Sequence, residues 1–497
     1  MNDFSPIEAN IAQVHQAYAE QKLTAVELVT WYLGRIQTYD KAGPMLQAIV
    51  TVNHAALAEA ATLDEHYRAT GTFKGPLHGI PVLVKDQAET ANIRTTFGTK
   101  AFEHYIPAKD ATIIAKLKAA GAIILAKTSM CDFAAGWFSF SSMTDHTKNP
   151  YDPAREAGGS SAGTCAGLAA NLGLVGIGED TGGSIRLPAS FNNLFGLRVT
   201  TGLISRTGLS PLVHFQDTPG PVARTVRDVA KLLDVMVGYD PADAYTTAAL
   251  LTKDAGLYEH KLEAFAPDRI RIGVLSSGFG SAAECADVNA VVHTAIHKLK
   301  DIGLTVVDAV EIPDLAALLA ETSLYTHQSK ADLDRFLRNR NGEACDSFMD
   351  VYHQQLFHPM NDLFHDIANG PDVPESANDY FRRRVAQDTL RRTILHTMGQ
   401  HDVQMLVFPD VQILPPLRSD LMAGKWGTLT FPTNTVIASQ ARLPAISVPA
   451  GFTEADIPVG MELLGMPYAE LSLLQVAYQY EQSVRPRQAP ALHMESV

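Results

Sequence analysis

Short apolar runs alternate with segments of helical periodicity along most of the chain. The apolar runs are expected to be strands because they are short, continuous and rich in Val, Ile and Leu; they cover residues 48–52, 80–85, 122–127, 172–178, 270–275, 304–310, 405–408 and 445–449. Helical spacing marks residues 26–36, 54–70, 111–121, 161–171, 226–238, 287–301 and 469–483. Thr24 and Glu27 form a capping-box pattern before the first of these helices. The alternation predicts an α/β fold, an α/β/α sandwich around a large, mostly parallel mixed β-sheet.

Residues 314–400 differ from this pattern. They are rich in long polar and aromatic side chains, which favours a helical insertion that could form a lid over a substrate. The strand pattern returns after residue 400, so we expect one domain over residues 1–497 rather than a string of modules. Its parts are an N-terminal helical region at 1–75, a catalytic core at 76–313, the insertion at 314–400 and a return to the core at 401–497.

The net charge and the cysteines indicate which partners and which cellular compartment to expect. The formal net charge is -14 at pH 7, which disfavours nucleic acid or an anionic membrane as a partner because polyanions are bound by clustered Lys and Arg. The four cysteines are scattered along the chain, as is typical of free thiols in a reducing compartment. No secretory signal is visible, and no apolar run approaches the roughly 18–20 residues that span a bilayer. We therefore expect a cytoplasmic protein.

The candidate chemistry lies in residues 158–188, where GGSSAG and GEDTGGS stand 20 residues apart at their first positions. Gly182 and Gly183 allow backbone shapes that could direct several N–H groups at one point, as an oxyanion hole requires. Ser184 ends this turn and could attack the carbonyl held there, but a serine hydroxyl needs a base. No histidine lies in the segment. Lys85, at the end of an apolar strand, is an alternative because desolvation favours the neutral amine, and Ser160 could relay the proton.

Other interpretations of the same residues are open. GGSSAG also satisfies G-x-S-x-G, the nucleophile elbow, but the residues before it are polar and broken by prolines, whereas that motif follows a buried strand. A glycine-rich helix start can bind phosphate, yet no GxxxxGK[ST] follows. Cys131 is a possible nucleophile, although an isolated cysteine is usually a small buried apolar residue. Taken singly, Lys85 would be read as a solvated charge and Gly-Gly-Ser as an ordinary turn.

Together, GGSSAG followed by GEDTGGSIRLP resembles the amidase signature family. GPLHGIPVLVKD, AGAIILAKTSM, LPAISVPAGF and PVGMELLG also resemble segments of that family, in family order, so the resemblance covers nearly the whole chain except about 314–400. It implies hydrolysis of carboxamide C–N bonds through an acyl-enzyme on Ser184, with Lys85 as base and Ser160 as relay. It implies no metal and no cofactor. Esters, anilides and carbamates would be accessible to the same acyl-enzyme.

The resemblance also implies roles for neighbouring residues. The N–H groups of Thr181, Gly182, Gly183 and Ser184 would form the oxyanion hole. Asp180 and Arg186 flank the active turn, and from this position we expect them to order it by hydrogen bonds, with a structural salt bridge elsewhere as the alternative. Ser161 could brace Lys85 or Ser160, or only cap the helix. The residues expected near the substrate are Met130, Cys131, Asp132, Phe133 and Trp137.

Three positions depart from the family pattern. Ala162 replaces a glycine, which we expect to be harmless because the residue is still small. Glu179 stands where Thr or Ser is common, and nothing in the sequence explains it. Arg442 replaces a glycine and would either face the pocket mouth or be solvated.

The expected partner is a small-molecule amide, and a homodimer is a family-level expectation. Two other functions stay open. One is the glutamine amidotransferase subunit of a tRNA-dependent complex, which shares this signature. The other is a non-catalytic binding protein on the amidase scaffold, which the presence of Lys85, Ser160 and Ser184 disfavours. The sequence alone does not identify the substrate.

Overall fold

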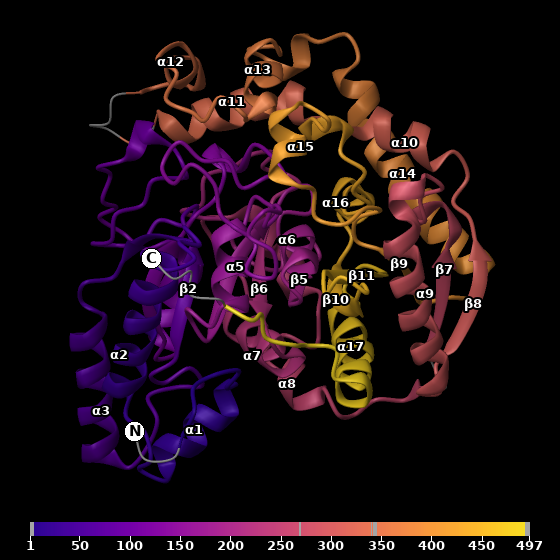
Figure 1. The fold of residues 1–497 in the computed structure, drawn as a ribbon. Helices are drawn as coiled ribbons and strands as arrows, with labels where there is room; N and C mark the ends of the chain where they lie inside the picture. The colour runs from indigo at the N-terminus through magenta and orange to yellow at the C-terminus, as the bar shows by residue number, and fades with distance from the viewer. Residues whose placement is uncertain (1–3, 268–269, 339, 341–344, 493–497) are drawn as a thin grey trace.

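A single large sheet organises the computed structural model, which describes residues 4–267, 270–338, 340 and 345–492. Among these residues the sheet has 11 strands in the order β1-β3-β2-β4-β6-β5-β10-β11-β9-β7-β8 (Figure 1). The strands are β1 (Ile49–Val52), β2 (Pro81–Lys85), β3 (Ile123–Thr128), β4 (Val175–Asp180), β5 (Phe195–Arg198), β6 (Thr218–Ala223), β7 (Arg271–Leu275), β8 (Thr305–Val310), β9 (Met405–Pro409), β10 (Ala445–Phe452) and β11 (Pro458–Gly465). The prediction of an α/β fold around a large mixed sheet is confirmed.

Parallel pairing is confined to two blocks of this sheet. β2 lies parallel between β3 and β4, and β7 lies parallel between β8 and β9. The pairs β1–β3, β4–β6, β5–β6, β5–β10, β10–β11 and β9–β11 are antiparallel. The pattern of apolar residues in the sequence does not predict β5, β6 or β11. β6 contains Pro219 and Pro221, and proline usually marks a strand edge or a break rather than an interior strand.

Helices flank the sheet (Figure 1). Outside 314–400 they are α1 (Ile11–Ala19), α2 (Ala25–Arg35), α3 (Ala56–Thr70), α4 (Thr112–Ala119), α5 (Ala162–Ala169), α6 (Arg186–Phe191), α7 (Val226–Met236), α8 (Tyr258–Lys261), α9 (Ala286–Asp301), α15 (Arg418–Met422), α16 (Val436–Ala441) and α17 (Glu470–Val484). The expected capping box is present, with Thr24 Oγ1 accepting from the N–H of Glu27 at 3.1 Å. No helix of the described residues is long and apolar enough to cross a membrane.

Residues 314–400 form a group of helices beside one end of the sheet (Figure 1). They are α10 (Leu315–Thr322), α11 (Tyr325–Leu337), α12 (Phe348–His353), α13 (Asp362–Ala368) and α14 (Tyr380–Gln400). Apolar side chains of α11, α12 and α13 join a second core that also contains Phe97, Phe133 and Trp137, whereas those of α10 and most of those of α14 join a third core. The insertion is therefore packed against the segment that follows β3, where the substrate residues were expected.

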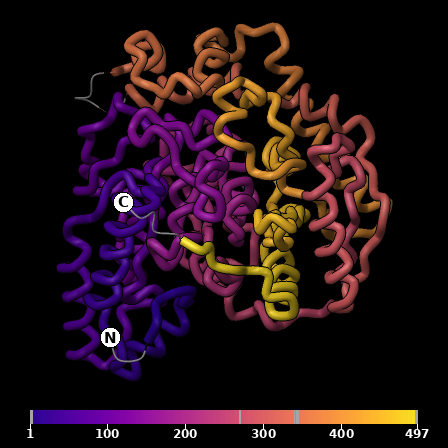
Figure 2. Tube along the Cα trace, in the orientation of Figure 1, coloured from indigo at the N-terminus to yellow at the C-terminus, as the bar shows by residue number. Residues whose placement is uncertain are grey.

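The two ends of the described chain meet. The C-terminal segment runs back toward the N-terminal helices (Figure 2). Arg487 Nη2 lies 2.9 Å from Glu8 Oε1, and both side chains are largely buried. This contact joins the C-terminal segment to the N-terminal region.

Candidate active site

The GEDTGGS turn leaves the carboxyl end of β4 and leads into α6. Gly183 has φ 123°, and a Cβ placed there would lie 1.8 Å from Thr435 Oγ1. The backbone shape and the lack of space both require glycine at this position. Ser184 follows it and is 3% exposed. The turn is thus held tightly, with the serine at its end in a nearly buried position.

Lys85 and Ser160 meet beside this turn. Lys85 ends β2, which pairs in parallel with β4, and Ser160 precedes α5 after a cis Gly159–Ser160 peptide bond. Lys85 Nζ lies 2.7 Å from Ser160 Oγ and 3.1 Å from the carbonyl oxygen of Glu179. The N–H of Ser161 donates to the carbonyl of Ser184 at 3.2 Å. The start of α5 is therefore joined to both the lysine and the turn.

Burial controls the charge of Lys85. Desolvation lowers the pKa of Lys85, and the neighbouring Glu179 carboxylate partly opposes this shift. A lysine whose neutral form is favoured in this way can accept a proton near neutral pH. The amine of Lys85 and the hydroxyl of Ser160 are thus in direct contact beside the turn that carries Ser184.

Asp180 organises the turn. Its carboxylate accepts the N–H groups of Gly183 at 2.9 Å and Ile185 at 3.2 Å. It also pairs with Arg186 at 3.2 Å and with Arg198 at 2.8 Å. Burial alone raises the pKa of Asp180, but the two guanidinium groups lower it well below its usual range. Asp180 and Arg186 therefore lie in direct contact around the turn, rather than in salt bridges elsewhere.

The predicted oxyanion donors differ in availability. The N–H of Gly183 is taken by Asp180, so this donor is not free for a substrate oxygen in the observed conformation. Within the described residues the N–H groups of Thr181, Gly182 and Ser184 have no acceptor in the protein. These three donors stay candidates for the oxyanion hole.

Ser161 connects the end of β4 with the start of α5. Its hydroxyl lies 3.3 Å from both the carbonyl oxygen and the N–H of Glu179. It makes no side-chain cap at the start of α5, so the alternative of a helix cap is wrong. Ser161 instead fixes the end of β4 against α5.

A small cavity of about 10 Å³ opens onto Ser184. The residues that line it with Ser184 and Gly182 are Ala134, Gly136, Trp137, Leu212, Tyr325, Leu363 and Thr428. That volume corresponds to roughly one water-sized sphere, so a substrate needs movement of the lining. Tyr325 belongs to α11 and Leu363 to α13, and sequence periodicity carried no signal that either would reach the turn.

The predicted substrate residues separate in the structure. Trp137 lines the cavity, and its Nε1 donates to the carbonyl of Gly182 at 3.1 Å. Met130, Cys131 and Phe133 are fully buried outside the lining. Burial raises the pKa of the Cys131 thiol, which disfavours a nucleophilic thiolate.

The carboxylate of Asp132 is held by hydrogen bonds from other segments of the protein. Its carboxylate accepts hydrogen bonds from Asn361 Nδ2 at 2.6 Å, from the N–H of His358 at 3.1 Å and from Ser142 Oγ at 2.5 Å. These partners tie the insertion to the segment after β3. Contact of Asp132 with a substrate is therefore not supported, because its oxygens are occupied and lie outside the cavity lining.

Within the described residues no group of three or more His, Cys, Asp or Glu side chains could hold a metal ion.

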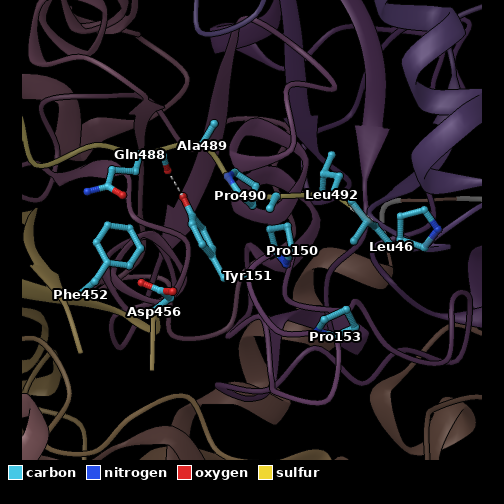
Figure 3. A pocket seen from close by; sticks show the side chains of 12 residues that line it. Leu46, Pro150, Tyr151, Pro153, Phe452, Asp456, Gln488, Ala489, Pro490 and Leu492 are labelled. Carbon is cyan, nitrogen blue, oxygen red and sulfur yellow. Dashed lines mark hydrogen bonds between the residues drawn. The ribbon is translucent and has the colours of Figure 1, made fainter. Parts of the chain in front are cut away.

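A larger hollow of about 560 Å³ lies away from Ser184 and is lined by Tyr151, Phe452 and Pro490 among others (Figure 3). Asp456 supplies its charge, and none of the predicted catalytic residues lines it. Lys85, Ser160 and Ser184 are thus absent from the lining of the larger hollow.

Lys85, Ser160 and the turn that carries Ser184 thus lie together at the ends of β2 and β4. Residues 27–474 match the family model described as Amidase. The chain belongs to the amidase family.

Two kinds of relative illustrate what the chain is similar to. A Glutamyl-tRNA(Gln) amidotransferase subunit of Acinetobacter baumannii is 32% identical over 95% of this chain and 96% of its own length. The solved peptide amidase from Stenotrophomonas maltophilia is 31% identical, covers 98% of this chain and 99% of its own, and has a TM-score of 0.86. The corresponding Glutamyl-tRNA(Gln) amidotransferase subunit from Thermotoga maritima is 25% identical over 100% of both chains, with a TM-score of 0.78. Both kinds of protein are similar over nearly the whole length.

Proposed function

We propose that this protein is a serine amidohydrolase that cleaves carboxamide C–N bonds through an acyl-enzyme on Ser184. The observation that carries the proposal is the buried Lys85 amine, 2.7 Å from Ser160 Oγ, beside the turn that bears Ser184. A desolvated lysine paired with a serine hydroxyl is a base suited to activating a nucleophile. Membership of the amidase family supports the same reaction class.

In the proposed mechanism, neutral Lys85 accepts the proton of Ser160 while Ser160 accepts the proton of Ser184. Ser184 Oγ attacks the amide carbonyl, and the N–H groups of Thr181, Gly182 and Ser184 stabilise the oxyanion. Ser160 then returns a proton to the leaving nitrogen, and the amine departs. Water hydrolyses the acyl-enzyme by the same relay in reverse.

The cavity lining favours an uncharged acyl group. Trp137, Leu212, Tyr325 and Leu363 surround Ser184, and no charged side chain lines the cavity among the described residues. A charged substrate group placed there would lose hydration without gaining an ionic partner. We therefore propose a neutral, largely apolar amide as the substrate of a stand-alone enzyme.

A second candidate function is that of a glutamine amidotransferase subunit. Its support is the 32% identity to the Glutamyl-tRNA(Gln) amidotransferase protein of Acinetobacter baumannii over nearly the full chain. Free glutamine carries an α-ammonium and an α-carboxylate, and the cavity as described offers no charged partner for either. This candidate therefore needs a rearranged site or a second protein in the complex.

The test is turnover by the purified protein alone. Wild type is assayed against neutral amides, anilides, esters, carbamates and glutamine, beside Ser184→Ala and a control, Ser281→Ala, at an exposed serine. We expect hydrolysis of neutral amides by wild type and the control, with loss of at least about 100-fold in Ser184→Ala. Turnover that survives in Ser184→Ala refutes the nucleophile. Selective glutamine hydrolysis would favour the amidotransferase function.

A further inference from the structure

The side-chain carboxyl of Glu179 lies against the candidate base but has no part in the mechanism above. Its Oε2 is 3.5 Å from Lys85 Nζ, and both side chains are 2% exposed. The carbonyl oxygen of the same residue is 3.1 Å from Lys85 Nζ. Glu179 therefore presents two oxygens to one buried amine.

These contacts match the hydrogen-bonding capacity of a neutral lysine. A neutral amine has two N–H donors and one lone pair. If the two Glu179 oxygens accept the N–H groups, the lone pair faces the third neighbour, Ser160 Oγ, at 2.7 Å. After proton transfer, the ammonium has three donors for the same three neighbours. Lys85 can thus change charge without moving.

We propose that Glu179 is the charge partner of Lys85: its carboxylate orients the amine toward Ser160 and stabilises the ammonium that forms as Ser184 attacks. This inference rests on the proposed function. The proton of Ser184 passes to Ser160 as the proton of Ser160 passes to Lys85. The new bond joins Ser184 Oγ to the carbonyl carbon, and the carbonyl π electrons move to the oxyanion. Glu179 gains no proton, as the aspartate of a Ser-His-Asp triad gains none while it stabilises the imidazolium.

The surroundings of Glu179 set the pH range in which it acts. Thr181 Oγ1 lies 3.1 Å from Glu179 Oε1 and 2.6 Å from Asp217 Oδ1. The titratable and charged groups that face the Lys85–Glu179 pair are Cys131, Asp180, Arg198 and Asp217. Burial raises the pKa of Glu179 to about 7, and the Lys85 charge opposes that rise. The carboxylate is accordingly available from about pH 7 upward.

Removal of this charge has a predictable sign. The Glu179 carboxylate raises the pKa of Lys85 against the lowering caused by burial. In Glu179→Gln the pKa of Lys85 falls further, so the lysine becomes neutral at a lower pH. We expect the acid limb of the pH–rate profile to move down by about one unit or more, with a lower plateau rate because the base is weaker.

The experiment measures covalent labelling of Ser184 by a fluorophosphonate probe between pH 6 and 10, which does not require the natural substrate. Glu179→Gln and Glu179→Thr both remove the charge, so either one serves if the other does not fold. Glu179→Asp keeps the charge and should retain the acid limb near its wild-type position. Asp217→Asn is the matched control, because it removes a carboxylate of the same cluster that makes no hydrogen bond or ion pair with Lys85.

The outcomes separate the two proposals. A downward shift in the charge-removing variants, larger than that in Asp217→Asn, supports the role of Glu179. An unchanged acid limb, or an equal shift in Asp217→Asn, overturns it. The same proteins are assayed against the amide panel: labelling without turnover refutes the proposed substrate class and leaves the role of Glu179 to be decided by the shift. Wild-type protein that is not labelled at any pH overturns both proposals.

Discussion

Replacement of Asp180 by Asn should destabilise the protein more than any exposed charge change. The Asp180 carboxylate accepts from Gly183, Ile185, Arg186, Arg198 and Ser439. Asn keeps the size of the side chain but replaces one acceptor oxygen with a donor that faces other donors. The substitution therefore removes the negative charge and several acceptor contacts at the centre of the active turn.

The loss of stability depends on the contacts that Arg186 and Arg198 retain after the substitution. Arg186 retains Glu462, whose Oε1 is 2.5 Å from Arg186 Nη1. Arg198 is fully buried and retains the carbonyl oxygens of Asp180 and Gln216, with Thr201, but no carboxylate within the described residues. Removal of one partner from a buried ion pair costs about 3–5 kcal/mol. We expect Asp180→Asn to lower the free energy of unfolding by that amount.

Urea unfolding at pH 7 measures this loss, with Asp308→Asn as the control. Asp308 pairs with Lys300 at 3.0 Å, and the side chains are 70% and 37% exposed, so its loss should cost less than about 1 kcal/mol. The pKa of Asp180 is lowered in the folded state, so its contribution is present above the unfolded pKa of about 3.9 and is lost as pH falls through the folded pKa. The difference between wild type and Asp180→Asn should therefore shrink in acid. A loss at pH 7 no larger than that of Asp308→Asn would refute the reasoning.

Tyr325, Asp410, Arg442 and Cys131 each allow one further test. Tyr325→Ala removes a ring that lines the cavity and should raise kcat/KM for a benzoyl amide relative to an acetyl amide by about tenfold or more; an unchanged ratio would contradict the assigned position. Burial beside Glu462 raises the pKa of Asp410, so the stabilising contribution of Asp410 is full below about pH 4 and is lost as pH rises through the folded pKa. In thermal melts between pH 5 and 9, Asp410→Asn should therefore lose less stability than wild type. Equal losses in the two proteins would count against this. Arg442 has φ 57°, so Arg442→Gly should raise the free energy of unfolding by about 1 kcal/mol, whereas a decrease would show that its side chain contributes more than its backbone costs. Cys131 is buried with a raised pKa, so iodoacetamide should not label it in the native protein, and rapid native labelling detected by mass spectrometry would contradict this.

Arg442 shows how the structure explains a departure that the sequence left open. The residue caps α16 in the left-handed region, which is the conformation that glycine adopts at low cost. Its side chain is partly buried, and Nε has no hydrogen-bond partner among the described residues. Arg442 is therefore only partly solvated, and its left-handed backbone carries a cost that glycine would avoid.

Local patterns in the sequence determined most of the predicted elements. The strand that ends at Lys85, the apolar run at 172–178 and the helix after Ser161 are continuous segments, because nearby residues set their burial and periodicity. The observed strand β4 extends this run to Asp180. The candidate catalytic residues were selected by the glycine-rich turn and by the resemblance of ordered motifs. β6 escaped prediction because its prolines contradict the local strand pattern.

Contacts between distant segments were decided only by the tertiary structure. The order of β2 and β4 in the sheet places the Glu179 carboxyl beside Lys85, although 94 positions separate them. Packing of the insertion brings Tyr325 to the cavity and places Asn361 against Asp132. Periodicity records whether a residue faces a core, but not which distant residue meets it there. The sequence therefore determined most of the elements and the candidate chemistry, while the tertiary structure decided the charge environment of Lys85 and the shape of the cavity beside Ser184.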